Sequence, residues 1–199
     1  MTCLHIALKE WSTAIDAIEV SKTILLFRKG GIHEPRPGFQ VQLGATLLFP
    51  TFSHQSSACL KPEWARLASS SQSVRLKLWA EVTDWFILRD PGLIPTLSPF
   101  HVWTDAFLEQ RLAWKPERPL YVVLCRFYQL RPALPLPDLP QSGGCRSWLN
   151  LEPPITVEAT VPLVSEANYR RQCLRIQRLM QSGVDQVLSG SDPPLEKCD

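Results

Sequence analysis

The sequence predicts an α+β protein, with a mixed or antiparallel sheet flanked by an N-terminal and a C-terminal helix and with long proline-rich loops. Apolar residues recur at helical spacing near both ends of the chain, and alternating or continuous apolar runs typical of strands occupy the middle. The order of these segments lacks the strict strand–helix alternation of a parallel sheet. The 18 prolines add fixed bends and extended loops.

The first predicted element is a helix over residues 4–20. Leu4, Leu8, Trp11, Ile15 and Ile18 are three or four positions apart, which places them on one stripe of a helix. A buried strand over residues 23–27 follows, because the apolar run there ends abruptly in two cations and two glycines, which indicate a turn.

The middle of the chain is predicted to form strands with a broken helix among them. Residues 39–43 alternate and residues 46–49 are apolar, so the two are expected to pair as a hairpin. Residues 55–69 favour a helix that Pro62 interrupts. Residues 74–82 give the clearest alternation of apolar and polar side chains, typical of a strand with one solvated face.

The second half is predicted to alternate less regularly. A helix over residues 106–112 has Thr104 as its N-cap, and a long strand covers residues 120–130. The proline-rich segment 131–144 is expected to be a loop, and residues 147–149 and 155–163 are expected to be weaker strands. A last helix over residues 166–181 has its apolar stripe on Tyr169, Cys173, Ile176 and Met180, with Arg171, Arg175 and Arg178 opposite. We expect one domain over residues 1–181 and a flexible tail over residues 182–199.

Composition excludes several classes of protein. The net charge of +2 is too small to demand a nucleic-acid or membrane partner, so any basic site must arise from clustering. The six cysteines contain no closely spaced pair typical of zinc sites, and the histidines show neither HxH nor HExxH spacing, so no metal site is predicted. With neither a signal-peptide pattern nor an apolar run of about 20 residues, we expect a cytoplasmic protein with reduced thiols and no membrane partner.

Six blocks of sequence carry a family resemblance, and they occur in the family's order. They are ALKEW at 7–11, RKGGI at 28–32, FPTFSHQ at 49–55, SPFHVWT at 98–104, RLAWKPERPL at 111–120 and GCRSWLNL at 144–151. Over residues 4–152 the chain resembles a bacterial, largely cyanobacterial family catalogued as domain of unknown function 1802. The resemblance implies a bacterial cytosolic protein, and it supplies neither an activity nor catalytic residues.

The residues predict a site for an anionic ligand, a nucleotide or a nucleic-acid phosphate. Paired glycines let a backbone approach an anion closely, and neighbouring cations neutralise it, although the order of residues is not that of a P-loop. The candidate binding residues are Arg28, Lys29, Gly30, Gly31, Gln55, Arg111 and Arg126, with the loop histidines His54 and His101 beside them. The alternative for the cationic turn is a hairpin-type turn whose cations are simply solvated.

Two other functions stay open at this stage. One is a phosphodiesterase or nuclease that uses His54 or His101 as its general base. The other is a protein-interaction module that uses exposed residues among the seven tryptophans. Cations near Trp114 and Trp148 suit single-stranded nucleic acid, since such sites combine positive charge with stacking aromatic rings. The sequence names no cofactor and no oligomeric state, and it leaves open whether the protein is an enzyme.

Overall fold

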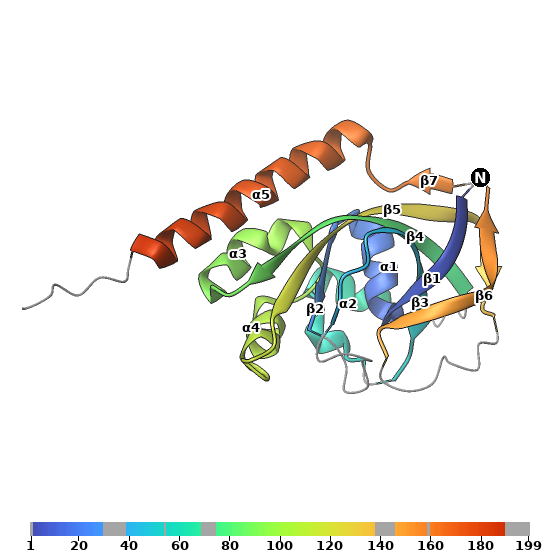
Figure 1. The fold of residues 1–199 in the computed structure, drawn as a ribbon. Helices are drawn as coiled ribbons and strands as arrows, with labels where there is room; N and C mark the ends of the chain where they lie inside the picture. Colours follow the sequence, from blue (N-terminus) through green and yellow to red (C-terminus); the bar gives the residue numbers. More distant parts are fainter. Residues whose placement is uncertain are drawn as a thin grey trace, which may run out of the picture.

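The structure is a computed structural model, which describes residues 2–29, 39–53, 55–68, 75–137, 146–158 and 160–189, with the side chains of 67–68 and 182–189 set aside. The described residues form a seven-stranded mixed sheet with helices packed on it (Figure 1), which confirms the predicted α+β class. The strands are β1 (Thr2–Trp11), β2 (Leu25–Arg28), β3 (Gly44–Thr51), β4 (Arg75–Leu88), β5 (Leu120–Pro135), β6 (Trp148–Val157) and β7 (Thr160–Pro162). The α-helices are α1 (Ser12–Ser21), α2 (Pro62–Ala68), α3 (Ile94–Leu97), α4 (Asp105–Ala113) and α5 (Glu166–Ser189). Short 3-10 turns are η1 (Ser57–Cys59), η2 (Pro91–Leu93) and η3 (Ser98–Phe100).

The sheet has the order β2-β5-β4-β3-β1-β6, and β7 pairs with β5. The pair β1 and β3 is parallel, and the other pairs are antiparallel. β2 and β1 are four places apart in this order, yet the Arg28 side chain of β2 reaches the backbone carbonyl of Lys9 in β1 at 3.0 Å. The sheet is therefore strongly curved, and Figure 1 shows its strands wrapping around α1.

The predicted first helix is wrong over its first half, where the chain forms β1 instead. Leu4, Ala7 and Leu8 are buried, as are Lys9 and Glu10, because β1 lies between β3 and β6 and is covered on both faces. A strand buried on both faces need not alternate, so helical spacing of its apolar residues can arise without a helix. Only the second half, α1 at Ser12–Ser21, is helical.

The predicted hairpin of residues 39–43 with 46–49 is also wrong. Residues 39–43 form no strand, and β3 pairs with β1 and β4. Phe39 instead fills the space between β5 and β6, with its ring 5.8 Å from that of Tyr121 and stacked 5.7 Å from that of Trp148. An aromatic contact between distant strands replaces the local hairpin pairing. Alternation in the sequence alone does not distinguish these two arrangements.

Other predicted elements are confirmed with changed bounds. β2, β4, α4 and α5 occur where they were expected, and α2 follows η1 with the predicted break at Pro62. β5 continues through the first part of the predicted 131–144 loop and ends at Pro135. Its partner β4 pairs with it along nearly its whole length, from Arg75 opposite Pro135 to Leu88 opposite Leu120. This long ribbon is what extends both strands beyond their predicted ends.

The C-terminal helix packs on the sheet through the predicted stripe. Tyr169, Ile176 and Met180 are buried in the main apolar core, and the Tyr169 hydroxyl is 2.6 Å from the Thr83 hydroxyl of β4. α5 thereby covers the β4–β5 ribbon beside α3 (Figure 1). Within the described residues, no helix is long and apolar enough to cross a membrane.

Candidate functional site

Part of the predicted site lies together in the structure, and part does not. Gly30, Gly31 and His54 lie outside the described residues. Arg28, Lys29 and Arg111 meet where β2 ends beside α4. Gln55, His101 and Arg126 have other surroundings, each given below.

Arg28 is held by the end of β1. Its Nη1 donates to the Lys9 carbonyl at 3.0 Å and to Oε2 of Glu10 at 3.3 Å, and its guanidinium lies over the Phe39 ring at 5.4 Å. Glu10 is only 5% exposed, and its other oxygen accepts from the Trp11 backbone N–H at 2.9 Å. The ion pair thus joins β2 to β1 across the curved sheet, and it engages both oxygens of the buried carboxylate.

Arg111 brings a second cation to the same carboxylate. It lies half-buried in the last turn of α4. Burial and the charge of Arg28 lower the pKa of Arg111, and Glu10 opposes this change. Within the described part of the chain, Arg111 has no ion pair of its own. Arg28 is thus the ion-pair partner of Glu10, while Arg111 feels the charges of both residues without pairing. The cluster of Glu10, Arg28 and Arg111 therefore carries an excess positive charge.

Lys29 takes a structural position beside the cluster. Its side chain is 1% exposed, and Nζ donates to the carbonyls of Arg111 at 2.9 Å and Leu112 at 2.6 Å. Those carbonyls belong to the C-terminal turn of α4, whose backbone acceptors lack helical partners. Burial, and next the charge of Arg111, lower the pKa of Lys29. Lys29 thus fixes the end of α4, and with it Arg111, against the end of β2.

An exposed indole follows Arg111 along the chain. The Trp114 ring is 38% exposed. Nζ of Lys115 lies 4.5 Å from its centroid and the Arg111 guanidinium 5.6 Å from it, both within cation–π range. Lys115 adopts a left-handed backbone conformation (φ 49°), which turns the chain after α4. The cluster is therefore bordered by an aromatic ring and a further cation.

Gln55 lies beside the first turn of α1. Its Oε1 accepts from the Thr13 backbone N–H at 3.3 Å, two residues after Trp11. The N-cap residue of α1, Trp11, makes no side-chain cap hydrogen bond. In the described residues Gln55 therefore supplies an acceptor for one of the free N–H groups at the start of α1.

His101 does not have the environment of a general base. It is 1% exposed, its Nδ1 accepts from the Trp103 backbone N–H at 3.2 Å, and Nε2 has no hydrogen-bond partner. Its ring packs edge-to-face on Phe27 with centroids 5.1 Å apart. Burial, with a smaller effect of the Lys61 charge, lowers its pKa to about 3. The imidazole is neutral and its basic nitrogen is occupied, so a catalytic role for His101 is not supported.

Arg126 stands apart from the cluster. It lies on β5, and its Nη1 pairs with Oε2 of Glu166 at 2.5 Å, at the start of α5. Its guanidinium also lies over the Tyr128 ring at 5.3 Å. Arg28 is opposite Tyr121, five positions earlier on the same strand. Arg126 therefore ties the last helix to the sheet, and the expected convergence with Arg28 is not found.

Sequence reasoning missed the acidic member of the cluster. Glu10 lies off the apolar stripe of the helix predicted over residues 4–20, whereas the structure makes it a buried residue of β1. Its position in the ALKEW block was a signal, but only the curvature of the sheet places it at Arg28, 18 residues away. No group of three or more histidine, cysteine or acidic side chains suited to a metal ion occurs among the residues that the structure describes.

Comparisons with known proteins give a family match and a slight structural likeness. The family model described as Domain of unknown function (DUF1802) matches residues 7–175. A crystal structure of a mutant of the ZmASCH protein from Zymomonas mobilis is similar at a TM-score of 0.45 and 11% identity, covering 73% of this chain and 87% of that one. A likeness of that size transfers no function. No curated protein matches the chain.

Proposed function

The chain belongs to the DUF1802 family, and we propose that it binds the phosphate of a nucleotide or nucleic acid at the cluster of Glu10, Arg28 and Arg111. The observation that carries the proposal is the excess charge: the buried carboxylate of Glu10 is paired with Arg28, and the nearby charge of Arg111 has no carboxylate partner in the described chain. A partly buried cation without its own counter-ion favours the binding of an anion.

The chemistry of the cluster favours phosphate among anions. A guanidinium offers a planar fork of donors that fits phosphate oxygens in pairs, and such charge-assisted bonds are strong. Nη1 of Arg28 donates to the Lys9 carbonyl and the Glu10 carboxylate of β1. Arg111 has no ion pair in the described chain. The exposed Trp114 beside them supplies an aromatic surface, which sites for nucleotides and single strands use for stacking.

Three further predicted residues adjoin described ones in the sequence. Gly30 and Gly31 directly follow Lys29, and His54 directly precedes Gln55. We propose that these residues complete the site, with the glycines allowing the backbone to approach the phosphate. Lys29 takes a supporting part, because its Nζ is already committed to two carbonyls of α4.

Isothermal titration with inorganic phosphate, a nucleoside triphosphate and a single-stranded oligonucleotide tests the proposal. Replacing Arg111 by Gln should weaken binding of each ligand about tenfold to a hundredfold, the value of a lost charge-assisted bond. Arg66→Gln is the matched control, because Arg66 is an exposed arginine on α2, a helix that contributes no residue to the cluster. The proposal fails if none of the three ligands raises the thermal midpoint of the wild-type protein, since a bound ligand must do so.

Two further variants separate charge from stacking. Glu10→Gln removes the competing carboxylate, so it should tighten phosphate binding while it lowers stability by about 3 kcal/mol, as expected for a broken buried pair. Trp114→Ala should weaken the binding of the nucleotide and of the oligonucleotide but leave the binding of inorganic phosphate unchanged. Trp85→Ala is the control for exposure, because Trp85 is 40% exposed and its ring contact is with Tyr121.

The other two functions have less support. A hydrolase that uses His101 lacks an accessible base, for the reasons given above, and His54 lies outside the described residues. Of the seven tryptophans, Trp85 and Trp114 are the large exposed rings. Trp85 lies on β4 and Trp114 follows α4, so the two rings occupy separate positions. They therefore support a protein-interaction function less than the charge cluster supports phosphate binding.

A further inference from the structure

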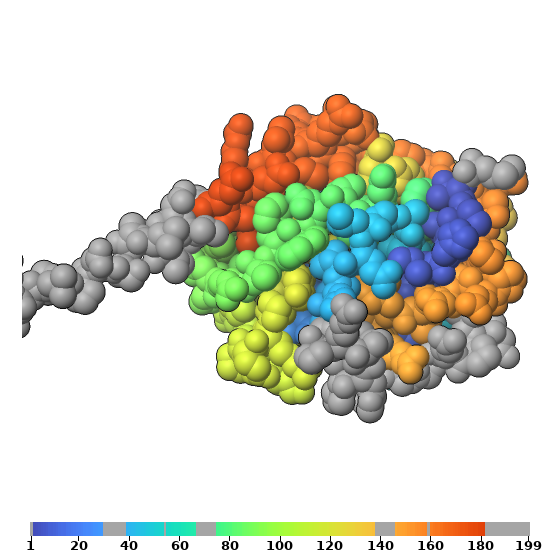
Figure 2. Space-filling model, in the orientation of Figure 1, coloured from blue at the N-terminus to red at the C-terminus, as the bar shows by residue number. Residues whose placement is uncertain are grey.

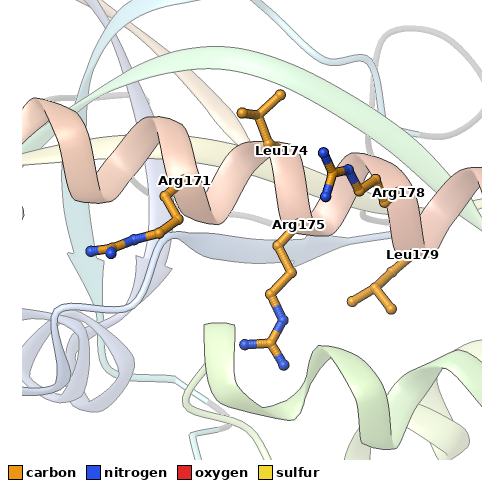
Figure 3. A pocket seen from close by; sticks show the side chains of 5 residues that line it. All are labelled: Arg171, Leu174, Arg175, Arg178 and Leu179. Carbon is orange, nitrogen blue, oxygen red and sulfur yellow. The ribbon is translucent and has the colours of Figure 1, made fainter.

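A second cationic surface lies on α5, away from the Arg28 cluster. Arg171, Arg175 and Arg178 are four and three positions apart, so they share one stripe along about 10 Å of helix axis. This stripe is opposite the buried one of Tyr169, Ile176 and Met180. The orange-to-red atoms of α5 form the upper edge of the molecule in Figure 2, and Figure 3 shows the three guanidiniums projecting from it.

The positive charge of the protein is concentrated on this helix. Residues 166–189 of α5 contain four arginines, one glutamate and one aspartate, a net charge of +2, which equals that of the whole chain. The rest of the chain therefore sums to zero. The single glutamate of the segment, Glu166, is already engaged by Arg126 and by Arg170.

The three arginines have contacts but no carboxylate partner within the described chain. Arg171 donates to the side-chain oxygen of Asn168 at 3.2 Å, and the Arg175 guanidinium lies over the Phe100 ring at 5.4 Å. Together with Leu174 and Leu179 they line an open hollow of about 590 Å³. In Figure 3, Arg175 and Leu179 point toward the neighbouring green helical segment, whereas Leu174 points away from it. The cations thus border a depression that a ligand can enter.

We propose that this α5 surface, defined by Arg171, Leu174, Arg175, Arg178 and Leu179, binds the phosphodiester backbone of a nucleic acid. Every cation in it is an arginine, whose fork pairs with phosphate oxygens. A nucleic-acid strand presents charges at even, short intervals, which suits cations repeated along one line of a helix. Leu174 is 56% exposed between the arginines and offers apolar contact to sugars and bases.

This inference does not depend on the proposed function of the Arg28 cluster. The cluster is built from β1, β2 and α4, whereas the α5 surface comes from one helix that packs on β4 and contacts η2. A mononucleotide therefore reports on the cluster alone, and a long strand reports on both surfaces.

The test is fluorescence anisotropy with a labelled oligouridylate over a range of about 50 to 200 mM salt. The variant combines Arg171→Gln, Arg175→Gln and Arg178→Gln. Its control combines Arg66→Gln, Arg89→Gln and Arg146→Gln, which are exposed arginines outside α5 and give the same change in net charge. We expect the α5 variant to bind at least about tenfold more weakly and to lose about 2 units of salt slope, since each released phosphate contact contributes about 0.7 in a single strand.

The outcomes distinguish the possible ligands. If the α5 variant and the control bind the oligouridylate alike, the proposal is overturned. It is also overturned if polyglutamate of equal charge displaces the oligouridylate as well as unlabelled oligouridylate does, because an acidic protein would then be the better match. Mononucleotide affinity that is unchanged in the α5 variant and lost in Arg111→Gln shows that the two surfaces act separately.

Discussion

At the scale of single residues, burial decides which charged side chains are available for a ligand. Lys29 and Lys61 have the same arrangement: Nζ of Lys29 bonds to the end of α4, and Nζ of Lys61 donates to the carbonyls of Ser98 at 2.5 Å and His101 at 2.7 Å. Each thus occupies backbone acceptors near a helical end. Arg111 differs because no backbone acceptor or carboxylate of the described chain pairs with it, and the charge of Arg28 lowers its pKa while that of Glu10 opposes the change.

His101 makes the stability depend on pH. Its folded pKa of about 3 lies below the ordinary value of 6.5, so between these values the unfolded chain binds a proton that the folded protein does not. Stability should therefore fall as pH drops below about 6.5, by up to about 1.4 kcal/mol per unit from this group. Urea unfolding of wild type and His101→Asn from about pH 7 to pH 4 measures the difference.

Asparagine is the appropriate replacement because its side-chain oxygen still accepts from the Trp103 N–H but does not titrate. The variant should be less stable at neutral pH, since it loses the ring contact with Phe27, and its stability should decline less toward acid. Equal declines in both proteins would rule out His101 as the source.

Removing the Lys29 ammonium should destabilise the fold. Lys29→Met keeps an apolar chain of similar length, but the carbonyls of Arg111 and Leu112 lose their donor, so we expect a loss of about 2 kcal/mol in urea unfolding. Lys115→Met, which alters an ammonium held only over the Trp114 ring, should stay within about 0.5 kcal/mol. If both variants have the same stability, Lys29 does not fix the end of α4.

At the scale of elements, α4 is the helix that positions the proposed site. Thr104 caps its start by accepting from the Phe107 N–H at 3.2 Å, and Lys29 binds its end. Its last turn holds Arg111, and Trp114 follows it directly. The orientation of α4 therefore sets where the second guanidinium stands relative to Glu10.

Loss of the Thr104 cap should lower the thermal midpoint. Thr104→Ala removes the acceptor for the Phe107 N–H and should cost about 1 kcal/mol, which corresponds to about 2–4 °C in a chain of this size. Thr104→Ser retains a capping oxygen and should stay near the wild-type midpoint. A fall of the same size in the serine variant would show that the methyl group, and not the cap, is responsible.

At the scale of the whole molecule, two kinds of long-range contact hold the curved sheet and α5 together. Arg28 and Phe39 link strands that are distant in sheet order, and Tyr169 and Arg126 attach α5 to β4 and β5. Because the apolar stripe of α5 faces the sheet, its arginines are presented outward. The two cationic surfaces therefore come from different elements, the cluster from β1, β2 and α4 and the other surface from α5.

The packing of α5 gives a prediction with an internal control. Ile176 is 0% exposed, so Ile176→Ala should cost about 2–5 kcal/mol of unfolding free energy. Leu174, two residues earlier and 56% exposed, should change stability by less than about 0.5 kcal/mol when replaced by Ala. Urea unfolding of the two variants measures this, and comparable losses would contradict the described orientation of α5.

The sequence by itself determined the α+β class, the strands β2, β4 and β5, and the helices α4 and α5 with the buried stripe of α5. These elements carry local signals: alternation, a capping residue, or apolar spacing that matches one helix face. It also marked Arg28, Lys29 and Arg111 as candidate binding residues, because they lie in the blocks that carry the family resemblance. Such signals act over a few residues, so they are readable without the fold.

Only the tertiary structure decided that residues 2–11 are a strand, that Glu10 faces Arg28, and that His101 is buried with its basic nitrogen occupied. The physical reason is that each depends on a partner far along the chain, brought close by the curvature of the sheet. A local pattern records which side chains are apolar or charged. The free energy of a charge depends on the burial and counter-charges around it, and these are set by non-local packing.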